Sequence, residues 1–158
     1  MSAFAVDSNV IVYALESDAG EKFERATNLL SCGLARGLRL PLQAVAETFT
    51  VLTGRKQWPS AQARQALEEI MAAMPTFGYT AASIARAMAL HERHGIPYWD
   101  AQMIATVAEH GCSTLLSEDM QDGRRFDVRD VGRAVRIVNP FGDANVALLT
   151  AAGLLDET

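Results

Sequence analysis

One carboxylate in this sequence lies in the middle of an apolar segment, where a charge is costly. The segment AFAVDSNVIVYAL, residues 3–15, reads as buried apart from the polar run Asp7, Ser8 and Asn9. An unpaired ionised group in apolar surroundings is strongly unfavourable, so Asp7 needs a charge partner, a metal ion, a capping role or a place at the edge of a cleft. The rest of the sequence has to decide among these roles.

Asp119 occupies a similar position later in the chain. It follows the apolar segment STLLS, residues 113–117, a predicted strand, just as Asp7 follows a predicted strand at residues 4–6. In an open parallel sheet the functional crevice lies beyond the carboxyl ends of the strands. The two carboxylates are therefore expected at one edge of a sheet, although they are far apart in sequence.

Two further acids belong to predicted helices. Asp100 lies near the start of a helix and shares a face with Met103, Ile104 and Val107, although Asp is also a common helix-capping residue. Glu47 lies at the border of the apolar stripe of the helix that follows the second predicted strand, where a solvated surface role is the simpler alternative. Each acid alone has an ordinary explanation, but all four are predicted to open on the same crevice.

A cluster of four carboxylates has a definite chemical consequence. Two carboxylates about 4 Å apart repel each other by about 4 kcal/mol at an effective dielectric constant near 20. Such a cluster must take up protons or bind a cation. Carboxylate oxygens without His or Cys suit Mg²⁺ or Mn²⁺. These ions polarise phosphoryl oxygens and lower the pKa of bound water, which is chemistry for phosphodiester bonds.

The elements that must position these acids follow from apolar spacing and from helix start and stop residues. Strands are predicted at residues 4–6, 113–117 and 134–138, a short one is predicted within GLRLPL, residues 37–42, and a minor strand is predicted at 76–79. Helices are predicted at residues 9–15, 21–34, 43–53, 61–74, 81–94, 98–110 and, in the tail, 142–155. Residues 118–126 are predicted to be a polar loop. Apolar strands separated by helices indicate a parallel sheet with helices on both faces.

Composition limits the class of protein. With 158 residues and 49% hydrophobic content, we expect one compact domain over residues 1–158. No apolar run approaches the length of a membrane span, and the start lacks a secretory pattern, so we expect a cytoplasmic protein with no membrane partner. Cys32 and Cys112 lack metal-ligand spacing and are expected to be reduced thiols.

The net charge of -5 argues against a general coat of positive charge for duplex DNA. The distribution is uneven, however. The segment RRFDVRDVGRAVR, residues 124–136, carries five arginines against two aspartates, a local balance of 5 - 2 = +3. It is predicted to be either a solvated surface loop or a patch that faces phosphates.

Four segments together resemble the PIN-domain ribonucleases, and most closely the VapC-type toxins of bacterial toxin–antitoxin pairs. They are FAVDSNVIVYAL, LQAVAETFTVL, IPYWDAQMIATVAEHGCSTLLSEDMQDG and IVNPF, and the resemblance covers nearly the whole chain. It implies an α/β fold, namely a PIN-like three-layer α/β/α domain with a short central parallel sheet.

In that family, acids at matching positions bind Mg²⁺ or Mn²⁺, as one or two ions, and support catalysis. The resemblance assigns both roles to Asp7, Glu47, Asp100 and Asp119. Supporting polar side chains match the family at Ser8, Asn9, Ser117 and Asp122. Glu118 stands beside Asp119, so the sequence leaves open which carboxylate touches the ion, and whether Asp122 joins the site.

The resemblance implies a metal-dependent endoribonuclease that hydrolyses RNA phosphodiester bonds and leaves a 5′-phosphate and a 3′-hydroxyl. Family substrates are usually tRNA or rRNA, a cognate antitoxin inhibits the enzyme, and the chains generally form homodimers. Because carboxylates repel RNA, nearby cations are also needed. The candidates for binding the RNA backbone are Arg55, Lys56, Arg124 and Arg125.

Two other classes of function remain as alternatives. The first is a catalytically silent PIN-like module that binds RNA or a partner protein, although such a module has no physical reason to keep four repelling acids. The second is a phosphate-transferring α/β domain with Asp7 as nucleophile. Asn9 stands where a dehalogenase-like enzyme needs a second Asp, and the only lysines are Lys22 and Lys56, so this class fits poorly.

Overall fold

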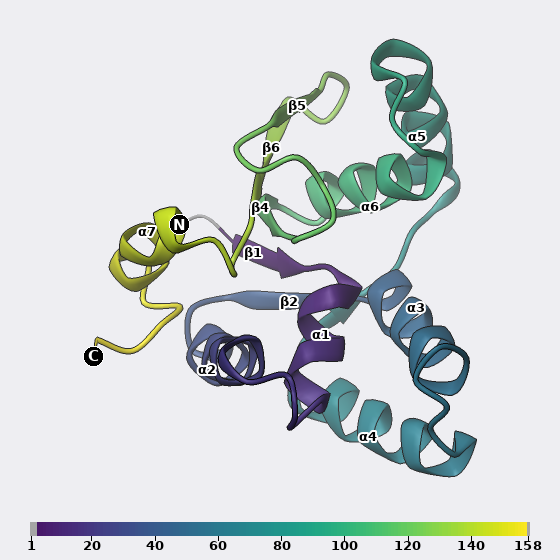
Figure 1. The fold of residues 1–158 in the computed structure, drawn as a ribbon. Coiled ribbons are helices and arrows are strands. Elements are labelled where there is room, and N and C mark those ends of the chain that lie inside the picture. The colour runs from purple at the N-terminus through teal and green to yellow at the C-terminus, as the bar shows by residue number, and fades with distance from the viewer. Residues whose placement is uncertain (1–2, 158) are drawn as a thin grey trace.

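The computed structural model describes residues 3–157, which form an α/β fold around one sheet (Figure 1). Within these residues the sheet has six strands in the order β3-β2-β1-β4-β6-β5. Neighbouring strands pair in parallel, except that β5 is antiparallel to β6. The strands are β1 (Ala3–Val6), β2 (Leu38–Pro41), β3 (Thr76–Phe77), β4 (Cys112–Leu116), β5 (Arg125–Val128) and β6 (Arg133–Val138). The predicted fold class is confirmed.

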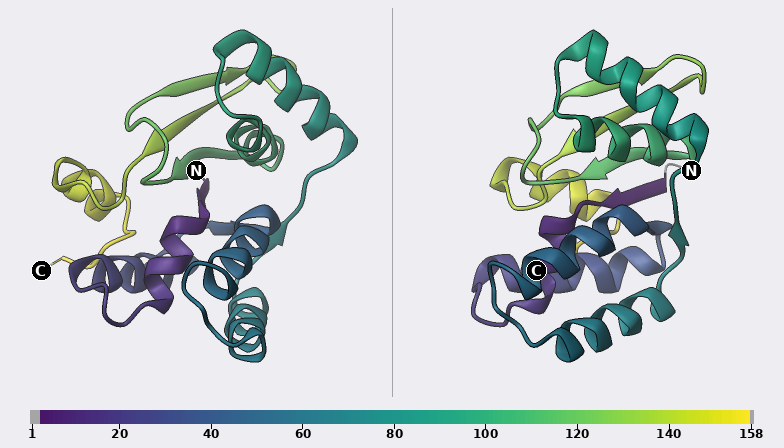
Figure 2. Two further views of the ribbon diagram at one scale, coloured as in Figure 1. Left: turned by 45° about the vertical axis from the view of Figure 1, so that its right-hand side comes forward. Right: turned by 90° about the vertical axis from the view of Figure 1, so that its right-hand side faces the viewer.

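The helices fall into two groups around this sheet. In both views of Figure 2, α1 to α4 gather around β1 and β2, whereas α5 and α6 lie beside β4, β5 and β6. None of the helices described in residues 3–157 is long and apolar enough to cross a membrane. The helices are α1 (Ser8–Leu15), α2 (Glu21–Leu34), α3 (Leu42–Thr53), α4 (Ser60–Ala73), α5 (Ala81–His94), α6 (Tyr98–Glu109), the 3-10 turn η1 (Asp143–Asn145) and α7 (Val146–Ala151).

Asp7 marks the change from strand to helix at the centre of the sheet. Its backbone is still extended, and its side-chain Oδ1 accepts a hydrogen bond of 2.8 Å from Ser8 N, the first residue of α1. Asp7 N donates a hydrogen bond of 2.9 Å to Leu116 O, at the end of β4. Asp7 therefore caps α1 and also lies at the carboxyl end of β1, as predicted.

Helix α6 is the most deeply buried helix of the described chain. Every residue from Ala101 to Ala108 is buried, which requires neighbours on all sides of the helix. Helix α5 packs along it on one side, and β4 and β6 pack on another. This burial holds the first turn of α6, and with it Asp100, at the margin of the core.

The predicted polar loop over residues 118–126 was wrong at its end. Residues 125–128 form β5, in which Arg125 and Asp127 are exposed while Phe126 and Val128 are buried. This alternation with a period of two is typical of a half-buried strand. The predicted tail helix over residues 142–155 was also too long, because it is divided into η1 and the short helix α7.

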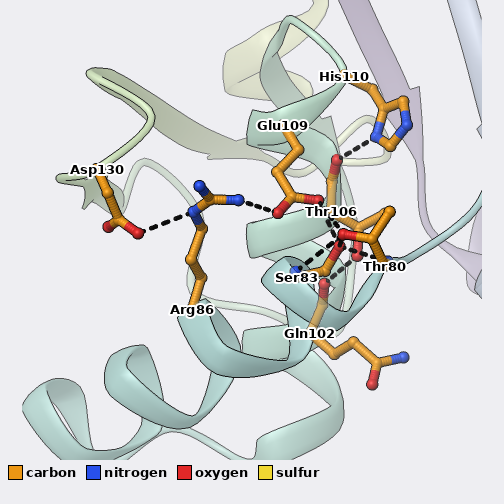
Figure 3. Close-up of polar contacts among 8 residues, drawn as sticks. All are labelled: Thr80, Ser83, Arg86, Gln102, Thr106, Glu109, His110 and Asp130. Atoms are coloured by element: carbon orange, nitrogen blue, oxygen red, sulfur yellow. Dashed lines mark hydrogen bonds and ion pairs between the residues drawn. The ribbon is translucent and has the colours of Figure 1, made fainter.

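A polar network joins α5, α6 and the turn between β5 and β6 (Figure 3). Arg86 of α5 forms an ion pair with Glu109 of α6, and its Nε lies 3.0 Å from Asp130 Oδ2 in the β5–β6 turn. Ser83 Oγ donates to the same Glu109 carboxylate, and Ser83 also accepts from the backbone N–H of Thr80 at the start of α5. The network makes this half of the molecule one connected unit.

Gly33 lies at a point where α2 packs closely against β2, and replacing it tests this packing. Gly-to-Ala replacement inside a helix normally stabilises by about 1 kcal/mol. Here the new Cβ would lie 2.6 Å from Leu38 Cδ2 and 2.9 Å from Leu38 Cβ, and Leu38 is fully buried. We expect Gly33→Ala to lower the free energy of unfolding by about 1–3 kcal/mol in urea titrations. Exposed Ser31→Ala in the same helix is the control, and a stabilised Gly33→Ala variant contradicts the packing.

Candidate active site

Asp7 is a buried carboxylate with defined partners. Its side chain is 6% exposed, and Ser117 Oγ donates a 2.7 Å hydrogen bond to Asp7 Oδ2. Burial raises the pKa of Asp7 from 3.8 to about 6, against the opposing effect of the hydrogen bonds from Ser117 and Ser8. The negative charges of Glu47 and Asp119 raise this pKa further. Asp7 is thus a group that a cation would stabilise in its ionised form.

Asn9 connects the first turn of α1 to the loop that follows β4. Its Nδ2 lies 3.2 Å from Asp119 Oδ2 and 3.3 Å from Ser117 Oγ, and its Oδ1 accepts a hydrogen bond of 3.1 Å from Glu118 N. Ser117 Oγ also accepts from Asp119 N at 3.2 Å. Because β1 and β4 are neighbours in the sheet, these polar residues bring Asp7 and Asp119 to the same edge.

Asp100 and Glu47 belong to the same electrostatic neighbourhood. Burial raises the pKa of half-buried Asp100, and the charges of Glu47 and Asp119 raise it further. Glu47 and Asp119 therefore act on both Asp7 and Asp100. Among residues 3–157, however, no three His, Cys, Asp or Glu side chains stand close enough to hold one ion together. The four acids therefore interact electrostatically but, in residues 3–157, do not form a complete set of metal ligands.

A chain of side-chain amides, which sequence analysis missed, joins α6 to α3. Tyr98 Oη donates to Gln102 Oε1 at 3.0 Å, and Gln102 Nε2 donates to Gln43 Oε1 at 3.0 Å. Gln43 Nε2 then donates to Glu47 Oε1 at 2.9 Å and to the backbone oxygen of Trp99 at 2.9 Å. The signal in the sequence is Gln102 itself, a polar residue that is 2% exposed within the apolar part of α6.

Glu118 and Asp119 have different surroundings. Glu118 forms an ion pair with Lys22 of α2, whose Nζ also donates to Tyr13 Oη at 3.3 Å and lies 4.8 Å from the centre of the Tyr13 ring. Asp119 accepts from the neutral amide of Asn9 instead. Of the two adjacent carboxylates, Glu118 is paired with a lysine, whereas the negative charge of Asp119 raises the pKa of Asp7.

Asp122 is engaged elsewhere. Its Oδ1 accepts a hydrogen bond of 2.8 Å from Asn139 N, and both of its oxygens lie 3.1 Å from Asn145 Nδ2. Asp122 therefore fastens the loop after β4 to the segment after β6. The structure places it in this structural role, apart from the four acids.

Two hollows flank the acids. A cavity of about 200 Å³ is lined by residues that include Ser8, Asp119, Arg55 and Lys56, although Lys56 Nζ lies 2.6 Å from Glu16 Oε1. A wider groove of about 850 Å³ on the other side of α3 is lined by Glu47 and the two amides described above. It also holds the aromatic side chains of Tyr79 and Trp99, which are 56% and 62% exposed.

The other two predicted cations lie on or beside β5. The guanidinium carbon of Arg124 lies 4.5 Å from the centre of the Phe126 ring, so this side chain packs on an aromatic surface. Arg125 is 70% exposed, and its Nε lies 3.5 Å from Asp127 Oδ1. The predicted cations thus form two separate groups, one beside the acids and one at β5.

Comparison with known proteins adds three findings. Residues 4–128 match the family model of the PIN domain, and this range contains all four acids. The fold is similar to that of VapC20 from Mycobacterium tuberculosis, described as a toxin that cleaves the sarcin-ricin loop, with 18% identity and a TM-score of 0.61 over 74% of this chain and 92% of that chain. A search of curated proteins by sequence gave no match.

Two toxin–antitoxin structures have similar folds. A toxin–antitoxin complex from Klebsiella pneumoniae matches with 18% identity and a TM-score of 0.60 over 89% of this chain and 98% of that chain. DNA-bound VapBC from Salmonella typhimurium matches with 12% identity and a TM-score of 0.60 over 89% and 99% of the two chains. At these identities the similarity establishes the fold.

Proposed function

The chain belongs to the PIN domain family, and we propose that it is a Mg²⁺- or Mn²⁺-dependent endoribonuclease that hydrolyses RNA phosphodiester bonds. The observation that carries the proposal is that two carboxylates with raised pKa values, Asp7 and Asp100, both lie in the field of Glu47 and Asp119. Such mutual repulsion at one sheet edge lowers the stability of the metal-free folded protein, and a bound cation relieves it.

The donor set suits a hard divalent ion. We assign Asp7, Glu47, Asp100 and Asp119 as the residues that would hold it, because oxygen ligands without His or Cys favour Mg²⁺ or Mn²⁺. Mg²⁺ keeps several waters and uses only one or two carboxylates directly, which agrees with four acids that share a field without a closed cage. When bound, the ion supplies polarisation of the phosphoryl oxygen and a more acidic water.

The neighbouring polar residues keep the acids in place. Ser117 and the backbone N–H of Ser8 hold the two oxygens of Asp7, and Asn9 holds Asp119 against the first turn of α1. Gln43 restrains Glu47, since an amide that is itself anchored at both ends cannot rotate freely. These fixed orientations mean that little side-chain entropy is lost when the ionised site forms.

The surroundings also suit a single-stranded RNA substrate. Arg55 provides positive charge beside the acids, together with Lys56, which is ion-paired with Glu16. The exposed rings of Tyr79 and Trp99 offer surfaces on which unpaired bases stack. We propose further that the protein is the cytoplasmic toxin of a toxin–antitoxin pair, that it forms a homodimer, and that it cleaves tRNA or rRNA. The toxin–antitoxin structures with the same fold support this assignment.

The decisive experiment is RNA hydrolysis with purified protein. Total tRNA and rRNA should be cleaved with Mg²⁺ or Mn²⁺ and left intact with EDTA, and Asp100→Asn should abolish cleavage while circular dichroism shows a folded protein. Binding of RNA without cleavage at any metal concentration would identify a catalytically silent binding module instead. A phosphate group attached covalently to Asp7 would overturn the hydrolase in favour of a phosphotransfer enzyme.

The amide chain that ends at Glu47 gives a separate prediction. Gln43→Ala removes the hydrogen bond that orients Glu47, so we expect kcat for RNA to fall about 10-fold, with KM changed less than about 3-fold. Gln65→Ala is a matched control, because Gln65 makes the same kind of contact with Glu69 four residues later on exposed α4. Steady-state kinetics of both variants test the prediction. Equal kcat values for Gln43→Ala and wild type contradict it.

A further inference from the structure

Two arginines face each other on the side of the sheet that α6 does not cover. Arg125 of β5 and Arg136 of β6 are direct partners across the antiparallel pair, and Arg136 is in turn level with Thr114 of β4. The alternate residues Phe126 and Ile137 are buried and point to the opposite face. Arg125 and Arg136 are both exposed. We call the surface formed by Ser113, Thr114, Gly123, Arg125, Ala134 and Arg136 the arginine face.

The arginine face is hollowed, and Asp127 of β5 is the carboxylate beside it. Its six residues line a depression of about 430 Å³, and none of them is acidic. Arg125 has one weak neighbour, Asp127, at 3.5 Å. Within residues 3–157, no carboxylate lies within ion-pair distance of Arg136. On a chain with a net charge of -5, this surface is a local reversal of sign.

An arginine pair of this kind favours an anionic ligand. Side chains directly opposite on antiparallel strands have Cβ atoms about 4.5–5.5 Å apart, and like charges at that spacing are destabilising. Planar guanidinium groups bind phosphate oxygens through paired hydrogen bonds. Thr114, which is level with Arg136 in the sheet, adds a polar residue to the lining of the same depression. The surface therefore has the chemistry of a phosphate site, in which Arg136 has no ion pair among residues 3–157 and Arg125 has only the exposed pair with Asp127.

The loop after β4 connects the arginine face to the candidate active site. The loop that carries Asp119 runs from β4 to β5 and is hydrogen-bonded to β6 near both of its ends. Ser117 N donates to Val138 O at 3.0 Å, and Gly123 N donates to Ile137 O at 2.8 Å. Gly123 is itself part of the arginine face. Along β4, Thr114 and Ser117 are three residues apart, about 10 Å in a strand. A chain bound on the arginine face therefore leads to the acids over this loop.

We propose that the arginine face binds the phosphodiester backbone of the RNA substrate, beside the site of cleavage. This inference rests on the proposed ribonuclease function. An acidic protein is a poorer fit, because the lining holds no aromatic or large aliphatic side chain of the kind that anchors protein interfaces. Arg124, which packs on Phe126, is not part of this surface, whereas Arg136 joins the predicted Arg125 as a contact to the backbone.

RNA binding under varied salt tests the proposal. The double variant Arg125→Ala/Arg136→Ala is compared with Arg64→Ala, an arginine that is 67% exposed on α4 and gives a control for lost charge. All proteins carry Asp100→Asn to prevent cleavage, and the probe is a labelled pool of 20-nucleotide single-stranded RNAs of random sequence. We expect the double variant to bind about 10-fold more weakly at 0.1 M salt, and the slope of log K against log salt to shrink by about 1.4, about 0.7 for each lost phosphate contact.

The outcomes separate this inference from the proposed function. Equal affinity and equal salt slope for the double variant and the Arg64→Ala control overturn the inference, as does an absence of RNA affinity in the Asp100→Asn protein that keeps both arginines. Loss of binding to an acidic partner protein with unchanged RNA affinity also overturns it. If the double variant loses RNA affinity but the wild-type protein never cleaves RNA, the proposal that the arginine face binds RNA is supported and the ribonuclease assignment fails. In an active protein, the double variant should raise KM for the 20-nucleotide RNA more than Arg64→Ala does.

Discussion

Asp7→Asn is expected to lower RNA hydrolysis more than about 100-fold and, at the same time, to stabilise the metal-free protein at neutral pH. The loss of activity follows from removing a carboxylate proposed to hold the ion. The gain in stability follows from the pKa of about 6, because ionising Asp7 in the native state costs about 3 kcal/mol relative to the ordinary value of 3.8. Asn keeps the shape and a hydrogen-bonding partner for Ser117 without the buried charge.

The sign of the pH effect can be stated. The folded-state pKa of Asp7 lies above the unfolded value, so the native state binds more protons between about pH 4 and pH 6. The stability contributed by protonated Asp7 is therefore complete below pH 3.8 and is lost as the pH rises through about 6. Urea unfolding in EDTA at pH 4.5, 6 and 7.5 should show a steeper decline in wild type than in Asp7→Asn, in which the raised pKa of Asp100 is still present.

Two comparisons make the Asp7 prediction strict. Exposed Asp18→Asn should leave RNA cleavage unchanged, since that residue lies in a surface loop. Added Mg²⁺ should raise the melting temperature of wild type more than that of Asp7→Asn, because a ligand that binds only the native state stabilises it. An Asp7→Asn variant that is less stable than wild type at pH 7.5 contradicts the assignment of a strained buried carboxylate.

Asp119→Asn and Glu118→Gln should differ strongly although the residues are adjacent. Asp119→Asn is expected to reduce RNA cleavage more than about 10-fold, because it removes one of the four carboxylates proposed to hold the ion. The negative charge of Asp119 acts on both Asp7 and Asp100. Glu118→Gln removes a partner of Lys22 and should change activity less than about 3-fold. The pair is partly exposed, so the cost in stability should stay below about 1 kcal/mol. Initial cleavage rates compare the two, and the reverse order of effects would show that Glu118 is the carboxylate in the site.

Much of the frame of this protein could be predicted from local patterns. Strand β1, the turn at Asp7 and the helices up to α6 follow from apolar spacing and from the residues that start and stop helices. The rule that parallel strands open on one edge was enough to place Asp7 and Asp119 together. Their roles in metal binding and catalysis stay predictions that the variants above test.

The parts that could not be predicted depend on contacts between distant residues. Gln43 and Gln102 are ordinary helix residues in the sequence, and only the packing of α3 on α6 makes them partners. Glu118 and Asp119 look alike until Lys22 of α2 is placed beside one of them. Strand β5 was missed because a segment rich in arginine resembles a loop, although its buried Phe126 carries the alternation of a strand.

The position of β4 between β1 and β6 has a consequence for the timing of synthesis. Asp7 and Glu47 leave the ribosome early, but the hydrogen bond from Asp7 to Leu116 and the side chain of Ser117 exist only after β4 has been translated. A nascent chain that ends before β4 therefore carries Asp7, Glu47 and Asp100, three of the four acids, without the strand that brings Asp119 to them. The sheet edge on which Asp7 and Asp119 lie is therefore assembled only after β4 and the loop that follows it have been translated, whereas α1 to α6 are complete before that point.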